Sequence, residues 1–396
     1  MTIIGSLGMF LYGMILMSES LQKAAGKKIR NALSSITSNK LRGILTGTVV
    51  TGTIQSSSAT TVMVVSFVNA GLLSLYESFG ITMGANIGTT VTPWIISLLG
   101  FGKTFDINVI LLPLIAISLP LLFSKRSSRK LWAEFIFGFT ILFLGLEFLK
   151  SSIPVLDETS PILNNIKEWG YNNFFSVLLF VGIGALLTII FQSSSAMMAF
   201  TFVIAVDGWV PFELAAAMVL GENIGTSITA NFAAIVANIS AKRAAIFHFI
   251  FNITGTIGAL LFLTPILRAT DYLTIEATGL SAFNTSDTAS IPLALAIFHS
   301  GFNIVNTLLF SSFLIYINKF IIWLLPSHKK EKDTSKIKHI NSAYMSTAEL
   351  SIYQAKRELV NFGKLSIKMF ELLPDLLMEK RNKKYKKLLN YIHDFE

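Results

Sequence analysis

The block Gln-Ser-Ser-Ser-Ala occurs twice, at residues 55–59 and 192–196, and its residue types suit the binding of a small anion. If the chain turns just before the serines, a helix begins there and presents free N–H groups and the positive end of its dipole. The hydroxyls can cap that helix and donate to an oxyanion, and the glutamines offer an amide donor or a carbonyl oxygen. The predicted anion ligands are Gln55, Ser56, Ser57, Ser58, Gln192, Ser193, Ser194 and Ser195.

A second polar block follows each copy at the same distance, as residues 84–89 and 221–226. Its glycines would let a membrane helix unwind and free carbonyl oxygens, to which side chains add further oxygens. Such an oxygen-only cage favours a hard cation such as Na⁺. The alternative is that the glycines only permit close packing of helices. The predicted sodium ligands are Asn86, Thr89, Thr90, Asn223, Thr226 and Ser227.

Ionisable residues are scarce around these blocks. Residues 43–99 and 174–241 contain no Lys or Arg. An anion held deep in a membrane must offset a large desolvation cost, and helix dipoles supply only fractional charge, so bound cations should supply the rest. Glu222 stands where the first repeat has Ala85, and it is a possible coupling acid that binds Na⁺ or a proton, or pairs locally. Asp207 and Glu213 flank a turn, where we expect them to be solvated.

The two blocks belong to a duplication of the chain with a constant offset of 137 residues. A smaller duplication relates residues 245–253 to residues 296–304, and a weaker match relates residues 11–14 to residues 143–146. The smaller one places His248 and His299 each four residues before an Asn, which favours core hydrogen bonding over metal ligation. The main offset also pairs Gly47 with Gly184, Thr51 with Thr188, Gly71 with Gly208 and Thr92 with Thr229.

The composition indicates a membrane protein. Of the 396 residues, 52% are hydrophobic and 14% are charged, with a mean hydropathy of +0.62, whereas soluble domains carry about 25% charged residues. The absence of cysteine excludes disulfides, zinc–thiolate sites and cysteine nucleophiles. The sequence has no Walker A, GxSxG or HExxH motif, so we expect neither an ATP-driven pump nor an enzyme. The basic excess lies mostly in the tail and carries no nucleic-acid recognition motif.

The apolar segments predict an all-α polytopic membrane protein. They are residues 2–18, 43–73, 79–100, 105–123, 131–149, 174–206, 212–238, 243–267 and 291–325. Segments 43–73 and 174–206 are too long for one span and contain the serine blocks, so we interpret both as re-entrant helical hairpins, which leaves about seven full spans. Every basic cluster then falls on the cytoplasmic side, and the two repeats have inverted topology. The apolar start is interpreted as a retained first span and not as a signal peptide.

This assignment of membrane spans and hairpins defines the predicted domains. A membrane domain at 1–326 contains repeat 1 at about 5–123, repeat 2 at about 131–267 and a final span at 291–325. A basic linker at 327–340 leads to a cytoplasmic tail at 341–396, predicted as two amphipathic helices separated near Pro374. The expected location is the plasma or inner membrane.

Paired QSSS blocks, each followed by a G-x-N-I-G-T block in an inverted repeat, resemble the bacterial branch of the type II sodium/phosphate cotransporters over residues 5–325. The resemblance implies Na⁺-driven uptake of inorganic phosphate, with phosphate at the eight Gln and Ser residues and Na⁺ as the co-transported ion. The tail resembles the start of a PhoU-like helical domain. The residues alone leave two alternatives: a Na⁺ symporter of another small oxyanion, and a membrane phosphate sensor that does not transport.

Overall fold

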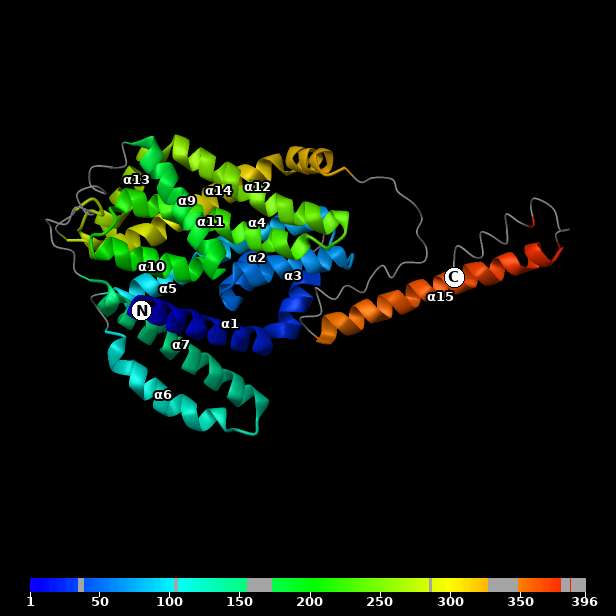
Figure 1. Ribbon diagram of the computed structural model, residues 1–396, viewed down its shortest axis with the longest axis horizontal. Helices are drawn as coiled ribbons and strands as arrows, with labels where there is room; N and C mark the ends of the chain where they lie inside the picture. Colours follow the sequence, from blue (N-terminus) through cyan, green and yellow to red (C-terminus); the bar gives the residue numbers. More distant parts are fainter. Residues whose placement is uncertain are drawn as a thin grey trace.

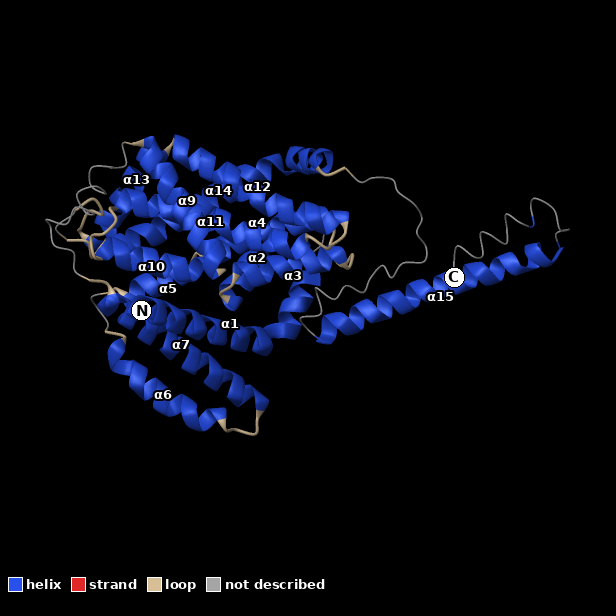
Figure 2. Cartoon of the chain, viewed as in Figure 1, coloured by secondary structure: helices blue, strands red, loops and turns tan. Residues whose placement is uncertain are grey.

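The computed structural model describes residues 1–34, 39–102, 106–154, 173–284, 287–326, 348–378 and Tyr385, and these residues form helices and connecting turns without a strand (Figures 1 and 2). The predicted all-helical class is confirmed. The helices are α1 (Thr2–Ser34), α2 (Lys40–Ile54), α3 (Ser57–Asn69), α4 (Leu75–Thr89), α5 (Val91–Ile95), a π-helix η1 (Ile96–Gly100), α6 (Asn108–Leu122), α7 (Ser127–Ser152), α9 (Phe174–Phe191), α10 (Ser194–Val206), α11 (Phe212–Ala234), α12 (Ile239–Leu261), α13 (Leu263–Thr278), α14 (Ile291–Leu324) and α15 (Ala348–Met378).

Five of the described helices are long and apolar enough to cross a membrane: α1 over Thr2–Gly26, α7, α9, α12 and α14. Their outer faces carry large apolar side chains, whose exposure to water would be unfavourable. On α14, for example, Leu308 and Phe313 are 63% and 57% exposed. Because a lipid-facing surface needs no polar cover, this pattern is typical of a polytopic membrane protein.

Helices α1 and α7 cross at glycines and form one side of the molecule, with α6 beyond α7 (Figure 1). A Cβ atom added to Gly13 would overlap the backbone of Leu142, and one added to Gly145 would overlap the backbone of Phe10. The weak sequence match between residues 11–14 and 143–146 therefore corresponds to two equivalent helices that pack against each other. The small residues allow the two backbones this close approach.

Helices α2 and α3 form a hairpin that packs on α4. A Cβ at Gly84 would overlap the carbonyl oxygen of Ile44, and one at Gly80 would lie 3.0 Å from the carbonyl oxygen of Lys40. The start of α2 thus lies beside the start of α4. Since α3 ends only a short turn before α4 begins, the chain must reverse its direction between α2 and α3.

Helices α9 and α10 repeat this arrangement on α11. A Cβ at Gly221 would overlap the carbonyl oxygen of Val181, and one at Gly184 would overlap that of Met218. Helix α10 ends a short turn before α11 begins, so this hairpin also reverses. The two hairpins start from opposite ends of the bundle, because α3 and α10 lead to turns at opposite ends (Figure 1).

The two ends of the bundle differ in charge. At one end Asn238 bonds to Asn69, and Arg243 donates two hydrogen bonds, of 3.0 and 2.7 Å, to the carbonyl oxygen of Leu325. The basic residues Lys40, Arg42, Lys125, Arg126, Lys242 and Arg243 lie there. At the opposite end Thr288 donates to the carbonyl oxygen of Val206 at 2.6 Å. The acids Asp106, Asp207, Asp271 and Asp287 lie there, and Asp157 and Glu158 fall outside the described residues.

Four local predictions differ from the structure. Segment 79–100 is divided at Thr90 into α4, α5 and η1, and segment 243–267 is divided at Phe262 into α12 and α13. Helix α1 extends well past residue 18, to Ser34. In the tail, α15 continues through Pro374 to Met378, because good helix formers on both sides outweigh the one hydrogen bond that proline removes. The linker at 327–340, residues 341–347 and most of the second tail helix lie outside the described part of the chain.

Candidate functional site

Each serine block occupies the turn of a hairpin. Gln55 ends α2 with φ 60° and ψ 24°, and Gln192 ends α9 with φ 52° and ψ 26°. These are the described non-glycine residues with positive φ. Such left-handed residues are costly for any side chain with a Cβ and are often found at functional sites. The turn thus lies at the residue that the sequence predicted.

The next residue of each block caps the second helix of its hairpin. Ser56 accepts a hydrogen bond from the N–H of Ala59, and Ser193 accepts one from the N–H of Ala196, both at 3.2 Å. Helices α3 and α10 therefore start at the serines, with their positive dipole ends and remaining free N–H groups there. This is the helix N-terminus that the anion prediction required.

All eight predicted anion ligands line one cavity of about 370 Å³. Helix α1 forms its wall from Leu11 to Gln22, so the cavity extends toward the basic end of the bundle. Gln192 is exposed and Gln55 is buried. The structure therefore brings together in one space two blocks that are 137 residues apart in the sequence.

Each hairpin tip also contacts the other repeat. Ser195 Oγ lies 3.5 Å from Thr92 Oγ1, and the equivalent Ser58 Oγ lies 3.5 Å from Thr229 Oγ1. Thr92 Oγ1 in turn donates to Gln55 Oε1 at 2.8 Å. The duplication pairs Thr92 with Thr229, but neither was predicted as a site residue. Because both lie at the same distance from their serine block, this pairing was the signal that could have identified them.

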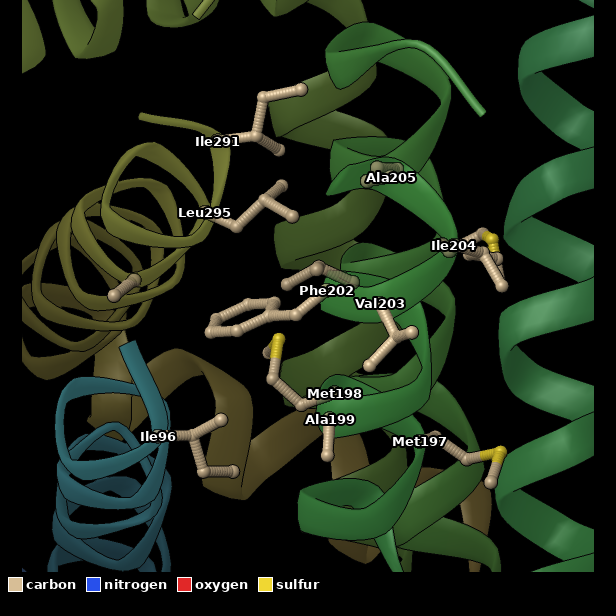
Figure 3. Close-up of a cluster of buried hydrophobic side chains, with 14 of the residues drawn as sticks. Ile96, Met197, Met198, Ala199, Phe202, Val203, Ile204, Ala205, Ile291 and Leu295 are labelled. Carbon is tan, nitrogen blue, oxygen red and sulfur yellow. The ribbon is translucent and has the colours of Figure 1, made fainter. Parts of the chain in front are cut away.

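Between the tip of the second hairpin and the acidic end, α10 is surrounded by buried apolar side chains. Met198 and Phe202 project from α10 toward Ile96 and Leu295, whereas Met197 and Ile204 project from the other face (Figure 3). Phe202 is fully buried and makes an edge contact with Phe101. An ion in the cavity would not pass this layer without movement of α10 or of its neighbours.

Beyond this layer, at the acidic end, lies a separate cavity of about 410 Å³ that includes Asp106, Lys150 and Asp207. Lys150 donates to the carbonyl oxygen of Gly100 at 2.5 Å and lies 3.3 Å from Glu147 Oε2. Asp207 is exposed, as predicted. Partial burial raises the pKa of its carboxyl group, and the positive charge of Lys150 counteracts that rise.

The six predicted sodium ligands do not form one cage. Helix α4 continues to Thr89 and α11 continues unbroken through residues 221–226, so the predicted unwinding at the glycines is wrong. The glycines permit close helix packing, which was the alternative interpretation. Thr90, Thr226 and Ser227 use their hydroxyl groups to donate to backbone carbonyls one turn earlier, at Ile87, Glu222 and Ile224.

Asn86 belongs to a buried network that connects the two repeats. Asn252 Nδ2 donates to the carbonyl oxygen of Asn223 at 2.8 Å, so Asn252 Oδ1 is free to accept from Asn86 Nδ2. Asn86 Oδ1 then accepts from His248 Nε2 at 3.0 Å. Because a carbonyl oxygen only accepts, this order assigns His248 to the tautomer protonated at Nε2.

His299 has the same role in the second repeat. Asn223 Nδ2 donates to the carbonyl oxygen of Val219 at 3.0 Å, which leaves Asn223 Oδ1 to accept from His299 Nε2 at 3.3 Å. The predicted core hydrogen bonding of both histidines is confirmed. The smaller duplication thus gives each motif asparagine its own histidine, a pairing that spacing alone did not reveal.

The remaining two predicted sodium ligands, Thr89 and Asn223, lie together with Glu222 beside the tip of the second hairpin. Glu222 is 1% exposed, and its Oε1 accepts from Thr201 Oγ1 at 2.7 Å. Thr201 was not predicted, since it lies in an apolar stretch of α10 without a motif around it.

Comparison with known proteins identifies the family. The sequence profile of the Na⁺/Pi-cotransporter family matches residues 9–151 and 164–303. "Uncharacterized protein YqeW" of Bacillus subtilis is 32% identical over 80% of this chain and 95% of its own length. "Putative inorganic phosphate export protein YjbB" of Salmonella typhimurium is 24% identical over 93% of this chain. This chain spans 64% of the length of that relative.

A human relative, "Sodium-dependent phosphate transport protein 2B", is 39% identical over 25% of this chain and 15% of its own length. No solved structure matches the sequence. The family profile covers both serine blocks and both asparagine blocks, the same residues that the structure gathers at the hairpin tips and around them. The chain therefore belongs to the Na⁺/Pi-cotransporter family.

Proposed function

We propose that the protein is a secondary symporter that couples Na⁺ movement to the transport of inorganic phosphate by alternating access. The observation that carries this proposal is the single cavity lined by both serine blocks. Two capped helix N-termini meet there, and no Lys or Arg is among the lining residues. The nearby Lys23 is paired with Glu19, an acid that lines the cavity, at 3.0 Å. Helix N-termini favour a compact anion, and the missing cationic side chains favour a transported cation as the source of compensating charge.

In this proposal the hairpins α2–α3 and α9–α10 are re-entrant and enter the membrane from opposite sides, with the basic end of the bundle and the tail in the cytoplasm. The cavity extends toward that basic end, so the conformation is the inward-facing one. The apolar layer around Phe202 is then the outer barrier that must open in the other state. Inverted repeats that exchange their roles are the usual structural basis of such alternation.

Phosphate export is a second candidate for the direction of transport, because the YjbB relatives carry export in their names. A coupled symporter is reversible, so its direction follows the gradients and not the fold. An exporter that is independent of Na⁺ would share the phosphate cavity but would need no cation site.

Transport into liposomes separates these candidates. Purified protein should accumulate labelled phosphate when an inward Na⁺ gradient is imposed, and an equal K⁺ gradient should give no accumulation. Competition with sulfate and small carboxylates then defines the oxyanion. Equal uptake in Na⁺ and K⁺ would overturn Na⁺ coupling, and saturable binding without accumulation would favour a sensor. Efflux of loaded phosphate without Na⁺ would favour the independent exporter.

A further inference from the structure

A small cavity of about 10 Å³ lies beside the tip of the second hairpin. This space is about enough for one water molecule or one small ion. Its polar lining comes from four helices: Thr89, Ser194, Ser195, Glu222, Asn223 and His299. Ser194 and Ser195 also line the large cavity, so the two spaces share a wall.

Glu222 brings a buried carboxyl group to this cavity, without a cationic side chain beside it among the lining residues. Its Oε1 is held by Thr201, whereas its Oε2 is buried and has no hydrogen-bond partner among the described residues. Residues 174–241 contain no Lys or Arg. A carboxylate that is buried without a cationic partner carries a large desolvation cost, so the group either holds a proton or is compensated by a bound cation that displaces the proton.

The chemistry of the lining indicates what that ligand is. The hydroxyls of Thr89 and Ser195 and the carboxylate of Glu222 are hard oxygen donors. His299 is protonated at Nε2 because it donates to Asn223, so its buried and unpartnered Nδ1 presents a lone pair. One negative charge among neutral donors matches a monovalent cation, whereas Ca²⁺ sites use several carboxylates.

We propose that this cavity is a binding site for one Na⁺ ion, with Glu222 Oε2 as its charged ligand. The proposal rests on the proposed Na⁺-coupled transport. It locates one of the co-transported Na⁺ ions in this cavity. A cation there lies against Ser194 and Ser195, whose helix N-terminus faces the anion cavity on the other side. Its charge therefore compensates the bound anion, which links the two ions energetically.

The site is specific to the second repeat. The offset of 137 residues pairs Glu222 with Ala85 and Thr201 with Val64. Ala85 and Val64 are both buried, at 0% and 1% exposure, so the first repeat packs apolar groups in the equivalent place. The duplication thus preserves both anion-binding tips but provides this carboxylate only once.

Two variants test the site. Glu222→Gln keeps the size and the hydrogen bond with Thr201 but removes the charge, so a purely structural role would survive it. The double variant Thr201→Val, Glu222→Ala reproduces the apolar pair that the first repeat already packs. Each should raise the Na⁺ concentration for half-maximal phosphate uptake by at least about tenfold, as expected for the loss of a charged ligand. Each should also lose Na⁺-dependent thermal stabilisation of the purified protein, measured against choline.

Glu213→Gln, in the first turn of the same helix, is the matched control and should behave as wild type. If wild-type protein responds to Na⁺ and Glu222→Gln keeps its half-maximal concentration within about twofold, the site is wrong while the proposed function stands. If wild-type uptake does not depend on Na⁺, the proposed function itself fails. If the double variant Thr201→Val, Glu222→Ala does not fold, Glu222→Gln alone tests the cation site.

Discussion

The two hairpins share one design at their tips and differ in the surroundings of those tips. Both place a left-handed glutamine before a serine that caps a helix, and both tips reach a threonine of the other repeat. Yet Gln55 is buried and bonded to Thr92, whereas Gln192 is exposed to the cavity. In the proposed function the equivalent parts bind the anion, whereas the unequal parts distinguish the two repeats.

The strongest difference is electrostatic. The second repeat buries Glu222 beside its tip, and the first repeat buries Ala85. A strictly symmetric protein would hold the same cation twice or not at all. The difference at this buried pair, Glu222 with Thr201 against Ala85 with Val64, places the proposed cation site in one repeat only, next to an anion site proposed to use both. Substitutions of equivalent residues in the two repeats therefore test where the repeats are equivalent and where they differ.

The largest effect is expected where both repeats are equal. Gly84→Ala and Gly221→Ala each place a Cβ on a backbone carbonyl of the packed helix, which cannot move aside as a side chain would. Overpacking costs about 1–3 kcal/mol and occasionally more, and overlap with a backbone oxygen places both variants at or above the top of that range. Both variants should lower the yield and the thermal stability of the protein. Gly182→Ala, in the same helix as Gly184 but with open space around it, should be neutral or slightly stabilising.

A smaller, again equal, effect is expected at the serines. Ser57→Ala and Ser194→Ala each remove a hydroxyl donor from the anion cavity, and hydrogen bonds to charged groups contribute about 1.5–3 kcal/mol. Each variant should therefore reduce phosphate uptake by about tenfold or more, with protein stability near that of wild type. Normal uptake in both would show that the anion binds elsewhere. A loss in only one would show that the two tips are not equivalent.

The smallest effect is expected at the two buried histidines, and it should differ between the repeats. His248→Leu and His299→Leu each leave the Oδ1 of a buried asparagine unpaired, at a cost of about 1–3 kcal/mol, and should lower thermal stability similarly. Only His299 lines the proposed cation cavity. Its variant should also raise the Na⁺ requirement of uptake, whereas His248→Leu should leave that requirement unchanged. Equal changes in the Na⁺ requirement would argue against a single, second-repeat site.

The tips were predictable from the sequence because repeated Gln-Ser-Ser-Ser blocks combine a turn, a cap and a donor in adjacent residues. The charge pattern likewise predicted which ends of the helices lie together. The glycines of the second blocks were misinterpreted, because glycine permits both unwinding and close contact, and only the facing helix shows which applies. Thr201 and the histidine–asparagine pairs were not predictable, since they depend on which helices are neighbours in space.

The coupling of the two ions is the central claim, and phosphate binding to purified protein at several Na⁺ concentrations tests it most directly. A cation next to the shared serines should raise phosphate affinity, and the linkage is reciprocal, so phosphate should raise Na⁺ affinity by the same factor. We expect phosphate affinity to increase by at least about fivefold between Na⁺-free and saturating Na⁺. This increase should be lost in Glu222→Gln. A phosphate affinity that is the same at every Na⁺ concentration would contradict the account.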